Sequence, residues 1–122
     1  MDPFKTPGAV SWGQLSTPDV EAAKAYYAKV FGWTMETMPM PGGAYTAIKV
    51  GDSSIGGITP STDGKSSWLD YVTVADIEAT VATAKAAGGR VVTPVTEIPT
   101  VGRFAVLAHA QGGVIAAIQY AG

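Results

Sequence analysis

The chain offers few side chains for acid–base or covalent chemistry. It contains one histidine, His109, and no cysteine, which excludes thiol chemistry, disulfides and thiolate metal ligands. Histidine is the side-chain type best suited to proton transfer near neutral pH, which makes His109 the obvious acid–base candidate, but its place just before Gln111-Gly112-Gly113 favours a solvated turn residue. Asp70 is a second candidate base, although its strand position favours a hydrogen-bonded strand residue. Nothing matches a nucleophile elbow, a phosphate loop or a dinucleotide fingerprint, so no catalytic residue is assigned.

The elements that must position such side chains occur twice in the chain. Residues 12–32 (WGQLSTPDVEAAKAYYAKVFG) align with residues 69–89 (LDYVTVADIEATVATAKAAGG), which places Asp19 on Asp76 and Gly32 on Gly89. A second pair follows, with residues 45–58 lying over residues 104–117. Two copies are too few for a solenoid, so the repeat predicts one domain built from two fused half-units.

The first half reads as a strand, a helix and three further strands. Thr17-Pro18-Asp19 predicts a helix start with Thr17 as the hydroxyl N-cap, and Gly32 predicts its left-handed end. A loop is expected at Pro39–Gly43. The expected strands are Ala9–Ser16, Trp33–Met38, Tyr45–Val50 and Ser54–Thr59, and the expected buried stripe of the helix is Val20, Ala23, Tyr27, Val30 and Phe31.

The second half repeats this order. Asp76 is expected to cap a helix that runs to about Ala87, and Thr96–Arg103 is expected to be a loop. Glu97 and Arg103, on either side of that loop, favour a surface ion pair over a polar contact to a ligand. The expected strands are Trp68–Val74, Arg90–Val95, Phe104–His109 and Val114–Tyr120.

These elements predict an α+β fold with two βαβββ half-units. Their curved antiparallel or mixed sheets are expected to form a cleft, with the helices on the convex faces. Residues 1–8 are predicted to be a loose N-terminal leader and residues 9–122 a single domain. The half-units are residues 9–60 and 68–120, and the polar residues 61–67 form the linker between them.

Composition limits the possible partners. The chain has 122 residues, a hydrophobic fraction of 47% and a formal net charge of −2, which indicates a globular domain and gives no electrostatic case for nucleic acid. No signal peptide and no membrane-length apolar run is recognised. We therefore expect a soluble, cytoplasmic protein with neither a nucleic-acid nor a membrane partner.

This order of elements resembles the glyoxalase/bleomycin-resistance/dioxygenase superfamily, also called the vicinal-oxygen-chelate (VOC) fold. The resemblance rests on three segments: STPDVEAAKAYYAKVFGW (residues 16–33), VADIEATVATAKAAGGRVV (residues 74–92) and VGRFAVLAHAQGGVIAAIQ (residues 101–119). Where many relatives carry Asp-Pro before the last Gln-Gly turn, this chain has His109-Ala110, which a turn also accepts.

The resemblance implies positions for a metal ion, because metal-using members hold a divalent cation with four His, Gln or Glu side chains. Those positions map here to Trp12, Gly57, Leu69 and Ala116. None of these side chains can ligate a metal. We therefore expect no metal site and no cofactor.

The same positions suggest a largely apolar pocket for a small molecule. The candidate ligand-binding residues are Trp12, Gln14, Tyr45, Gly57, Leu69, Tyr71, Phe104 and Ala116. Gly57 and Ala116 are expected to leave space opposite the larger residues, and Met35, Met38 and Met40 could form an adaptable lip. The alternative that Trp12 and Tyr71 simply fill the core stays open.

The expected function is capture of a small, largely apolar or aromatic molecule, by analogy with the drug-sequestering members of the superfamily. The alternative is a glyoxalase-like lyase or isomerase, either metal-dependent or metal-free and using Gln14, Tyr71 or His109. A third possibility is a dimeric subunit that has an interaction role only. Since relatives commonly pair, a homodimer is expected.

Overall fold

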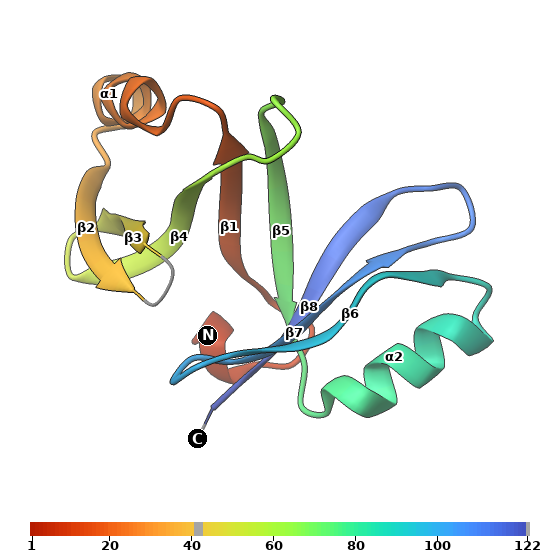
Figure 1. The fold of residues 1–122 in the computed structure, drawn as a ribbon. Coiled ribbons are helices and arrows are strands. Elements are labelled where there is room, and N and C mark those ends of the chain that lie inside the picture. Colours follow the sequence, from red (N-terminus) through yellow and green to blue (C-terminus); the bar gives the residue numbers. More distant parts are fainter. Residues whose placement is uncertain (41–42, 122) are drawn as a thin grey trace. The chain divides into compact units, whose positions relative to one another are not determined.

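The structure is a computed structural model that describes residues 1–40 and 43–121. The described residues run in order through a short 3₁₀ helix, eight strands and two α-helices (Figure 1). Their bounds are η1 Pro3–Lys5, β1 Val10–Thr17, α1 Val20–Phe31, β2 Thr34–Met40, β3 Gly43–Val50, β4 Ser53–Pro60, β5 Ser67–Thr73, α2 Ile77–Ala86, β6 Arg90–Ile98, β7 Gly102–Ala108 and β8 Val114–Tyr120. The strand–helix–strand–strand–strand order is therefore confirmed in both halves.

The chain is divided into two compact units. Trp12–Trp68 form the first-repeat unit, and Met1–Ser11 together with Leu69–Gly122 form the second-repeat unit. No helix in the described residues is both long and apolar enough to span a membrane.

In the first-repeat unit the strand order is β2-β3-β4-β1. The leading strand β1 pairs parallel with β4, whereas β2, β3 and β4 pair antiparallel, so the sheet is mixed. One face of this sheet packs against α1 through the buried residues Leu15, Ile48 and Ile58. Side chains from α1, from the connection after it and from β2 complete this core: Val20, Ala23, Tyr27, Trp33 and Met35.

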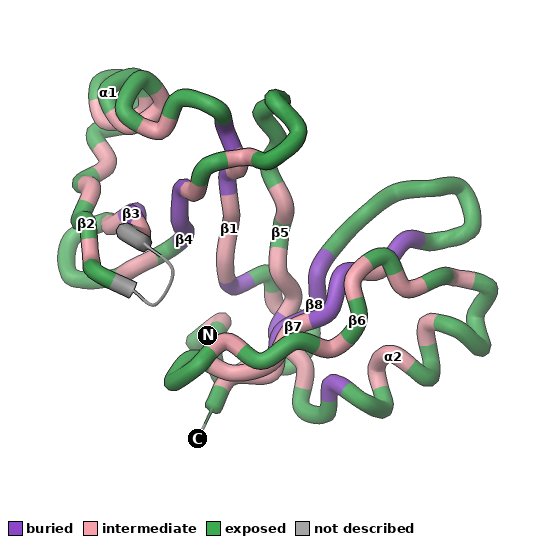
Figure 2. Tube along the Cα trace, viewed as in Figure 1, coloured by how far each residue is buried: buried purple, intermediate pink, exposed green. Residues whose placement is uncertain are grey.

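The second-repeat unit has the matching order β5-β8-β7-β6, with β5 parallel to β8. Ile77, Ala105 and Ala117 form its buried centre, and Val81 of α2 packs against them. Because side chains alternate across a strand, the neighbours of Ala105 and Ala117 in sequence point to the opposite, helix-free face. Figure 2 shows that the buried residues lie mainly on the strands.

The start of α1 differs from the expected one. Asp19, not Thr17, is the N-cap, because the Asp19 carboxylate accepts a hydrogen bond of 3.0 Å from the Ala22 N–H. Thr17 still belongs to β1, and its hydroxyl lies 2.7 Å from the Ser66 hydroxyl. Gly32 ends the helix with φ 72°, as expected. In the second half, Asp76 caps α2 as predicted.

The expected apolar stripe of α1 is shorter than its spacing indicated. Val20, Ala23 and Tyr27 pack against the core, but Val30 is 50% exposed and Phe31 is 60% exposed. Phe31 instead stacks on the Tyr27 ring at 6.0 Å between centroids. The last turn of α1 therefore contributes little to the buried core.

The hairpins are tighter than expected, because two predicted loops are largely strand. Within the expected loop Pro39–Gly43, β2 continues to Met40 and β3 begins at Gly43, while residues 41 and 42 lie outside the described residues. The expected loop Thr96–Arg103 is mostly a β6–β7 pairing in which Glu97 lies opposite Arg103. Strand pairing satisfies backbone groups that a loop would leave to water.

The N-terminal residues are not a loose leader. η1 is capped by the Asp2 carboxylate, the Phe4 ring meets the Tyr120 ring edge-on at 5.2 Å, and Gly8 and Ala9 exchange backbone hydrogen bonds with Thr73. These contacts attach the segment to the second-repeat unit. Local sequence could not reveal them, because the partners are more than 60 residues away.

Candidate functional site

On the helix-free face of the first-repeat unit, Gln14 is the centre of a hydrogen-bond network. Its side-chain oxygen accepts from the Trp12 indole N–H at 3.0 Å and from the Tyr45 hydroxyl at 2.8 Å. Its amide nitrogen donates to the Thr59 hydroxyl at 3.3 Å. These bonds fix the orientation of the amide, and all four side chains come from strands of one sheet.

Gly57 lies directly beneath this network. The register places Gly57 beside Gln14 of β1 on one side and Ala47 of β3 on the other. A methyl group at residue 57 would overlap the Tyr45 hydroxyl and lie 2.9 Å from the Gln14 oxygen. The expectation that Gly57 leaves empty space is therefore wrong, because Tyr45 and Gln14 occupy it.

In the second-repeat unit the candidate residues form an aromatic face. Tyr71 of β5 lies opposite Ala116 of β8, and the Tyr71 and Phe104 rings are 5.9 Å apart with an interplanar angle of 52°. Ala116 is 1% exposed, whereas Leu69, Tyr71 and Phe104 are half-buried. The structure thus brings Trp12, Gln14, Tyr45 and Gly57 together in one unit and Tyr71, Phe104 and Ala116 together in the other.

A chain of hydroxyl groups lies next to Tyr71. The Thr73 hydroxyl is 2.7 Å from the Pro3 carbonyl oxygen and 2.8 Å from the Ser11 hydroxyl, which is 2.7 Å from the Tyr120 hydroxyl. A hydroxyl carries one hydrogen and a carbonyl only accepts. Thr73 therefore donates to Pro3, Ser11 donates to Thr73, and Tyr120 donates to Ser11.

Both tyrosines of this face are held in the neutral form. Burial raises the pKa of Tyr71 above its ordinary value of 10.0, and the neighbouring Tyr120 raises it further. Burial also raises the pKa of Tyr120. Burial is the larger influence on the pKa of Tyr120 and outweighs the hydrogen bond to Ser11, which lowers it.

Sequence reasoning missed three members of these two networks: Ser11, Thr59 and Tyr120. The period-2 pattern could have found Tyr120, because Ala116, Ile118 and Tyr120 share one face of β8. The contacts of Ser11 and Thr59 had no local signal, since each depends on a partner more than 40 residues away.

The remaining candidates for chemistry lie outside both groups. His109 is an exposed turn residue whose Nδ1 is 3.2 Å from the Gln111 N–H, which donates to it. Asp70 is exposed. Arg103 donates to the Gln119 side-chain oxygen at 3.4 Å on the helix-covered face, so the expected Glu97–Arg103 ion pair is not the contact found. In the described part of the chain, no three His, Cys, Asp or Glu residues gather where they could hold a metal.

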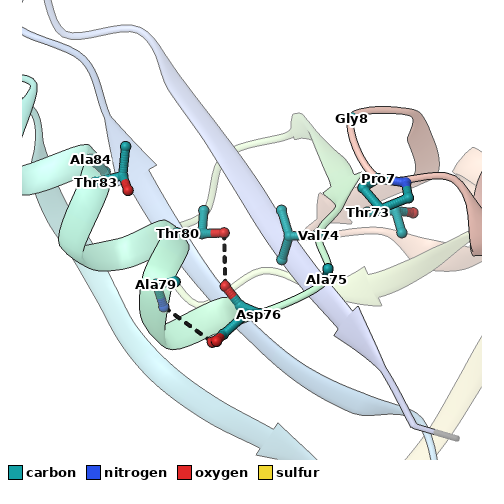
Figure 3. A pocket seen from close by; sticks show the side chains of 10 residues that line it. All are labelled: Pro7, Gly8, Thr73, Val74, Ala75, Asp76, Ala79, Thr80, Thr83 and Ala84. Carbon is teal, nitrogen blue, oxygen red and sulfur yellow. Dashed lines mark hydrogen bonds between the residues drawn. The ribbon is translucent and has the colours of Figure 1, made fainter.

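An open pocket of about 540 Å³ lies elsewhere in the second-repeat unit (Figure 3). It is lined by Pro7 and Gly8, by the end of β5 and by small residues of α2. At its rim the Asp76 carboxylate accepts from the Ala79 N–H, and the Thr80 hydroxyl donates to the Asp76 carbonyl. These polar groups already serve as the helix cap, and none of the predicted site residues lines this pocket.

Comparison with known proteins identifies relatives by sequence. The model of the Glyoxalase/Bleomycin resistance protein/Dioxygenase superfamily matches residues 9–115. The protein named "Putative glyoxylase CFP32" of Mycobacterium tuberculosis (strain CDC 1551 / Oshkosh) is 38% identical over 115 residues, covering 92% of this chain and 44% of its own. "Anthracycline biosynthesis protein DnrV" of Streptomyces peucetius is 28% identical over 127 residues, covering 90% of this chain and 46% of its own. The chain thus spans less than half the length of these relatives.

Solved structures share the fold. A variant of methylmalonyl-CoA epimerase from Streptomyces coelicolor, in complex with 2-nitronate-propionyl-CoA, superposes with a TM-score of 0.68 at 14% identity. The superposition covers 96% of this chain and 100% of the other. At this identity the likeness concerns the fold alone.

Proposed function

Because the chain belongs to the Glyoxalase/Bleomycin resistance protein/Dioxygenase superfamily, we propose that it binds a small, largely apolar aromatic molecule without a metal ion. The observation that carries the proposal is the pair of aromatic faces, each on the helix-free side of its sheet. One combines Trp12 and Tyr45 around the fixed Gln14 amide, and the other combines Tyr71 with Phe104. Aromatic walls with a few oriented polar groups are typical of small-molecule sites.

The metal-free part of the proposal rests on the chemistry of four positions. Where metal-using members are expected to carry ligands, this chain has Trp12, Gly57, Leu69 and Ala116. In addition, the space above Gly57 is taken by the Tyr45 hydroxyl and the Gln14 oxygen. A single amide and a phenol already bonded to each other are a poor ligand set for Zn²⁺, Ni²⁺ or Fe²⁺.

Ligand binding is tested by titrating the protein with a panel of two-ring aromatic compounds and following tryptophan fluorescence. Wild type is expected to show saturable quenching with some of them, and Trp12→Ala is expected to weaken that binding roughly tenfold, the usual loss for a buried aromatic contact. Trp68→Phe is the matched control, because Trp68 also carries an indole but packs beside Tyr27. Absence of saturable quenching with every compound would contradict the proposal.

The metal question has its own test. Elemental analysis of the purified protein is expected to find no stoichiometric transition metal. A melting scan with Ni²⁺, Zn²⁺, Mn²⁺ or Fe²⁺ is expected to leave Tm unchanged, since only a ligand of the native state stabilises it. A stoichiometric metal, or a shift of several degrees at modest metal excess, would refute the metal-free proposal.

A second candidate is a glyoxalase-like lyase or isomerase, favoured by the 38% identity to the protein named a glyoxylase. The two functions differ in what happens to the ligand. A sequestering protein returns each bound compound unchanged after hours of incubation, whereas a lyase or isomerase converts it. Mass spectrometry and chiral chromatography of the recovered ligand separate the two outcomes.

The proposal includes a homodimer in the cytoplasm. Exposed apolar side chains on α1 and at the start of β5 support an association surface: Tyr26 is 60% exposed, Phe31 60% and Trp68 42%. Sedimentation at micromolar concentration is expected to give about twice the chain mass of 12.5 kDa. A species of 12.5 kDa would overturn the dimer without affecting ligand binding.

A further inference from the structure

Tyr71 differs from the other tyrosines of the two aromatic faces in what its hydroxyl contacts. The Tyr45 hydroxyl is bonded to Gln14, and the Tyr120 hydroxyl to Ser11. Among the residues that the structure describes, no hydrogen-bond partner is found for the Tyr71 hydroxyl. That oxygen is also absent from the buried, unpaired polar atoms of the described chain, so it remains accessible from outside.

The neighbouring hydroxyl chain makes Tyr71 the available donor of this face. Tyr120 must donate its hydrogen to Ser11, because Ser11 donates to Thr73 and Thr73 to the Pro3 carbonyl. Tyr120 is therefore committed to the protein. The Tyr71 hydrogen is free to rotate toward an acceptor on a molecule that rests on the Phe104 ring.

The surroundings of Tyr71 select against charge. Burial disfavours ionisation of both tyrosines, which raises the pKa of each, and it equally disfavours a carboxylate on a ligand. Arg103, on the same strand as Phe104, does not offset this, because it donates to Gln119 on the helix-covered face. Ala116, which lies opposite Tyr71 in the strand pairing, is buried and adds no polar or charged group beside it.

We propose that the second-repeat unit recognises aromatic ketones or quinones, with the Tyr71 hydroxyl donating a hydrogen bond to a neutral carbonyl oxygen while the ring packs on Phe104. This inference rests on the proposed binding function and names the ligand class. It assigns to Tyr71 a role in specificity, since a hydrogen bond to a carbonyl discriminates between ligands of equal shape.

The test uses three probes that share one ring system: 1-acetonaphthone, 1-ethylnaphthalene and 1-naphthoate. Their affinities are measured by isothermal titration calorimetry for wild type, Tyr71→Phe and Tyr26→Phe. Tyr26→Phe is the matched control, because it removes a hydroxyl from an exposed tyrosine of α1. Melting curves establish that each variant is folded.

Wild type is expected to bind the ketone roughly three- to tenfold more tightly than the hydrocarbon, the range of one net hydrogen bond. Tyr71→Phe should lose that preference and bind the hydrocarbon within about twofold of wild type, whereas Tyr26→Phe should keep it. The naphthoate is expected to bind most weakly.

Three results would overturn the inference and leave the binding function standing: equal affinity of wild type for ketone and hydrocarbon, a preference that survives in Tyr71→Phe, or tightest binding of the naphthoate. The first and third of these results are measured on wild type alone, so they can overturn the inference even if Tyr71→Phe fails to fold. No measurable binding of any probe to wild type would overturn the proposed function together with the inference.

Discussion

At residue 57 the missing side chain is what lets two polar groups meet above the sheet. Gly57 lies under the Tyr45 hydroxyl and the Gln14 oxygen, which are 2.8 Å apart. Its conformation is not the reason for glycine, because Gly57 is not among the glycines with a positive φ. Glycine is needed for space, as at other strand positions that another group approaches closely.

Gly57→Ala is therefore expected to lower the free energy of unfolding by about 1–3 kcal/mol, the usual cost of an overpacked site. Gly13→Ala on β1 is the matched control, since its methyl group would meet the Trp68 ring at an ordinary 3.8 Å. Urea denaturation measures both. An equal effect of the two substitutions would show that the Tyr45–Gln14 contact is not what excludes a side chain at residue 57.

The raised pKa values of Tyr71 and Tyr120 predict alkaline sensitivity. A tyrosine whose pKa is higher in the folded than in the unfolded state binds more protons when folded. Its contribution to stability is therefore complete below the unfolded pKa of about 10 and is lost as pH rises through the folded value. In Tyr71→Phe, unfolding free energy is expected to fall less steeply above pH 10 than in wild type, measured by urea denaturation at a series of pH values. A parallel decline would contradict the assignment.

The side chain of Gln119, on β8, forms a hydrogen bond with the first residue of helix α2. The Gln119 oxygen accepts from the backbone N–H of Ile77 at 2.8 Å and from Arg103 at 3.4 Å. Ile77 has no exposed surface, so without Gln119 its N–H would be buried with no acceptor. Asp76 caps the Ala79 N–H in addition. The two contacts together fix where α2 begins.

Gln119→Leu is accordingly expected to destabilise the protein by about 1–3 kcal/mol, the cost of a buried unpaired donor. Gln119→Glu keeps an acceptor in place and gains a charge partner in Arg103, so this variant should lose much less stability. Thermal denaturation of the two variants decides. Equal losses would mean that water or another group satisfies the Ile77 N–H.

In the molecule as a whole, the N-terminal residues belong with the second repeat rather than the first. The Pro3 carbonyl is the final acceptor of the hydroxyl chain that starts at Tyr120, and the Phe4 ring packs on the Tyr120 ring. The compact division of the chain reflects this, because Met1–Ser11 group with Leu69–Gly122. The second-repeat unit therefore includes the N-terminal residues Met1–Ser11, which come before the first repeat in the sequence.

Deleting residues 2–8 is expected to lower Tm by several degrees, since it removes the acceptor for Thr73, the Phe4 contact and the backbone bond from Gly8. Differential scanning calorimetry measures the change. An unchanged Tm would show that the segment contributes nothing to the second-repeat unit.

Much of the fold could be predicted because its signals are local. Alternation along the strands placed Trp12 on one face with Gln14, and Tyr71 on one face with Leu69. The start of α2 was marked by Asp76 and the end of α1 by Gly32. The internal repeat predicted the same order of elements twice. The candidate site followed from those registers, and the structure brings its members together in two groups. At the start of α1, both Thr17 and Asp19 could have been the N-cap. Asp19 is the N-cap because its carboxylate accepts from the helix, whereas the Thr17 hydroxyl bonds to Ser66.

The sequence by itself determined the α+β repeat, the family and the faces on which the aromatic residues lie, because side-chain period and capping depend on near neighbours. Only the tertiary structure decided which hydroxyls hydrogen-bond to one another, that Tyr45 fills the space over Gly57, and that the Phe4 ring packs on Tyr120 of the last strand. Those contacts join residues that are tens of positions apart, and their formation depends on chain geometry that no local pattern encodes.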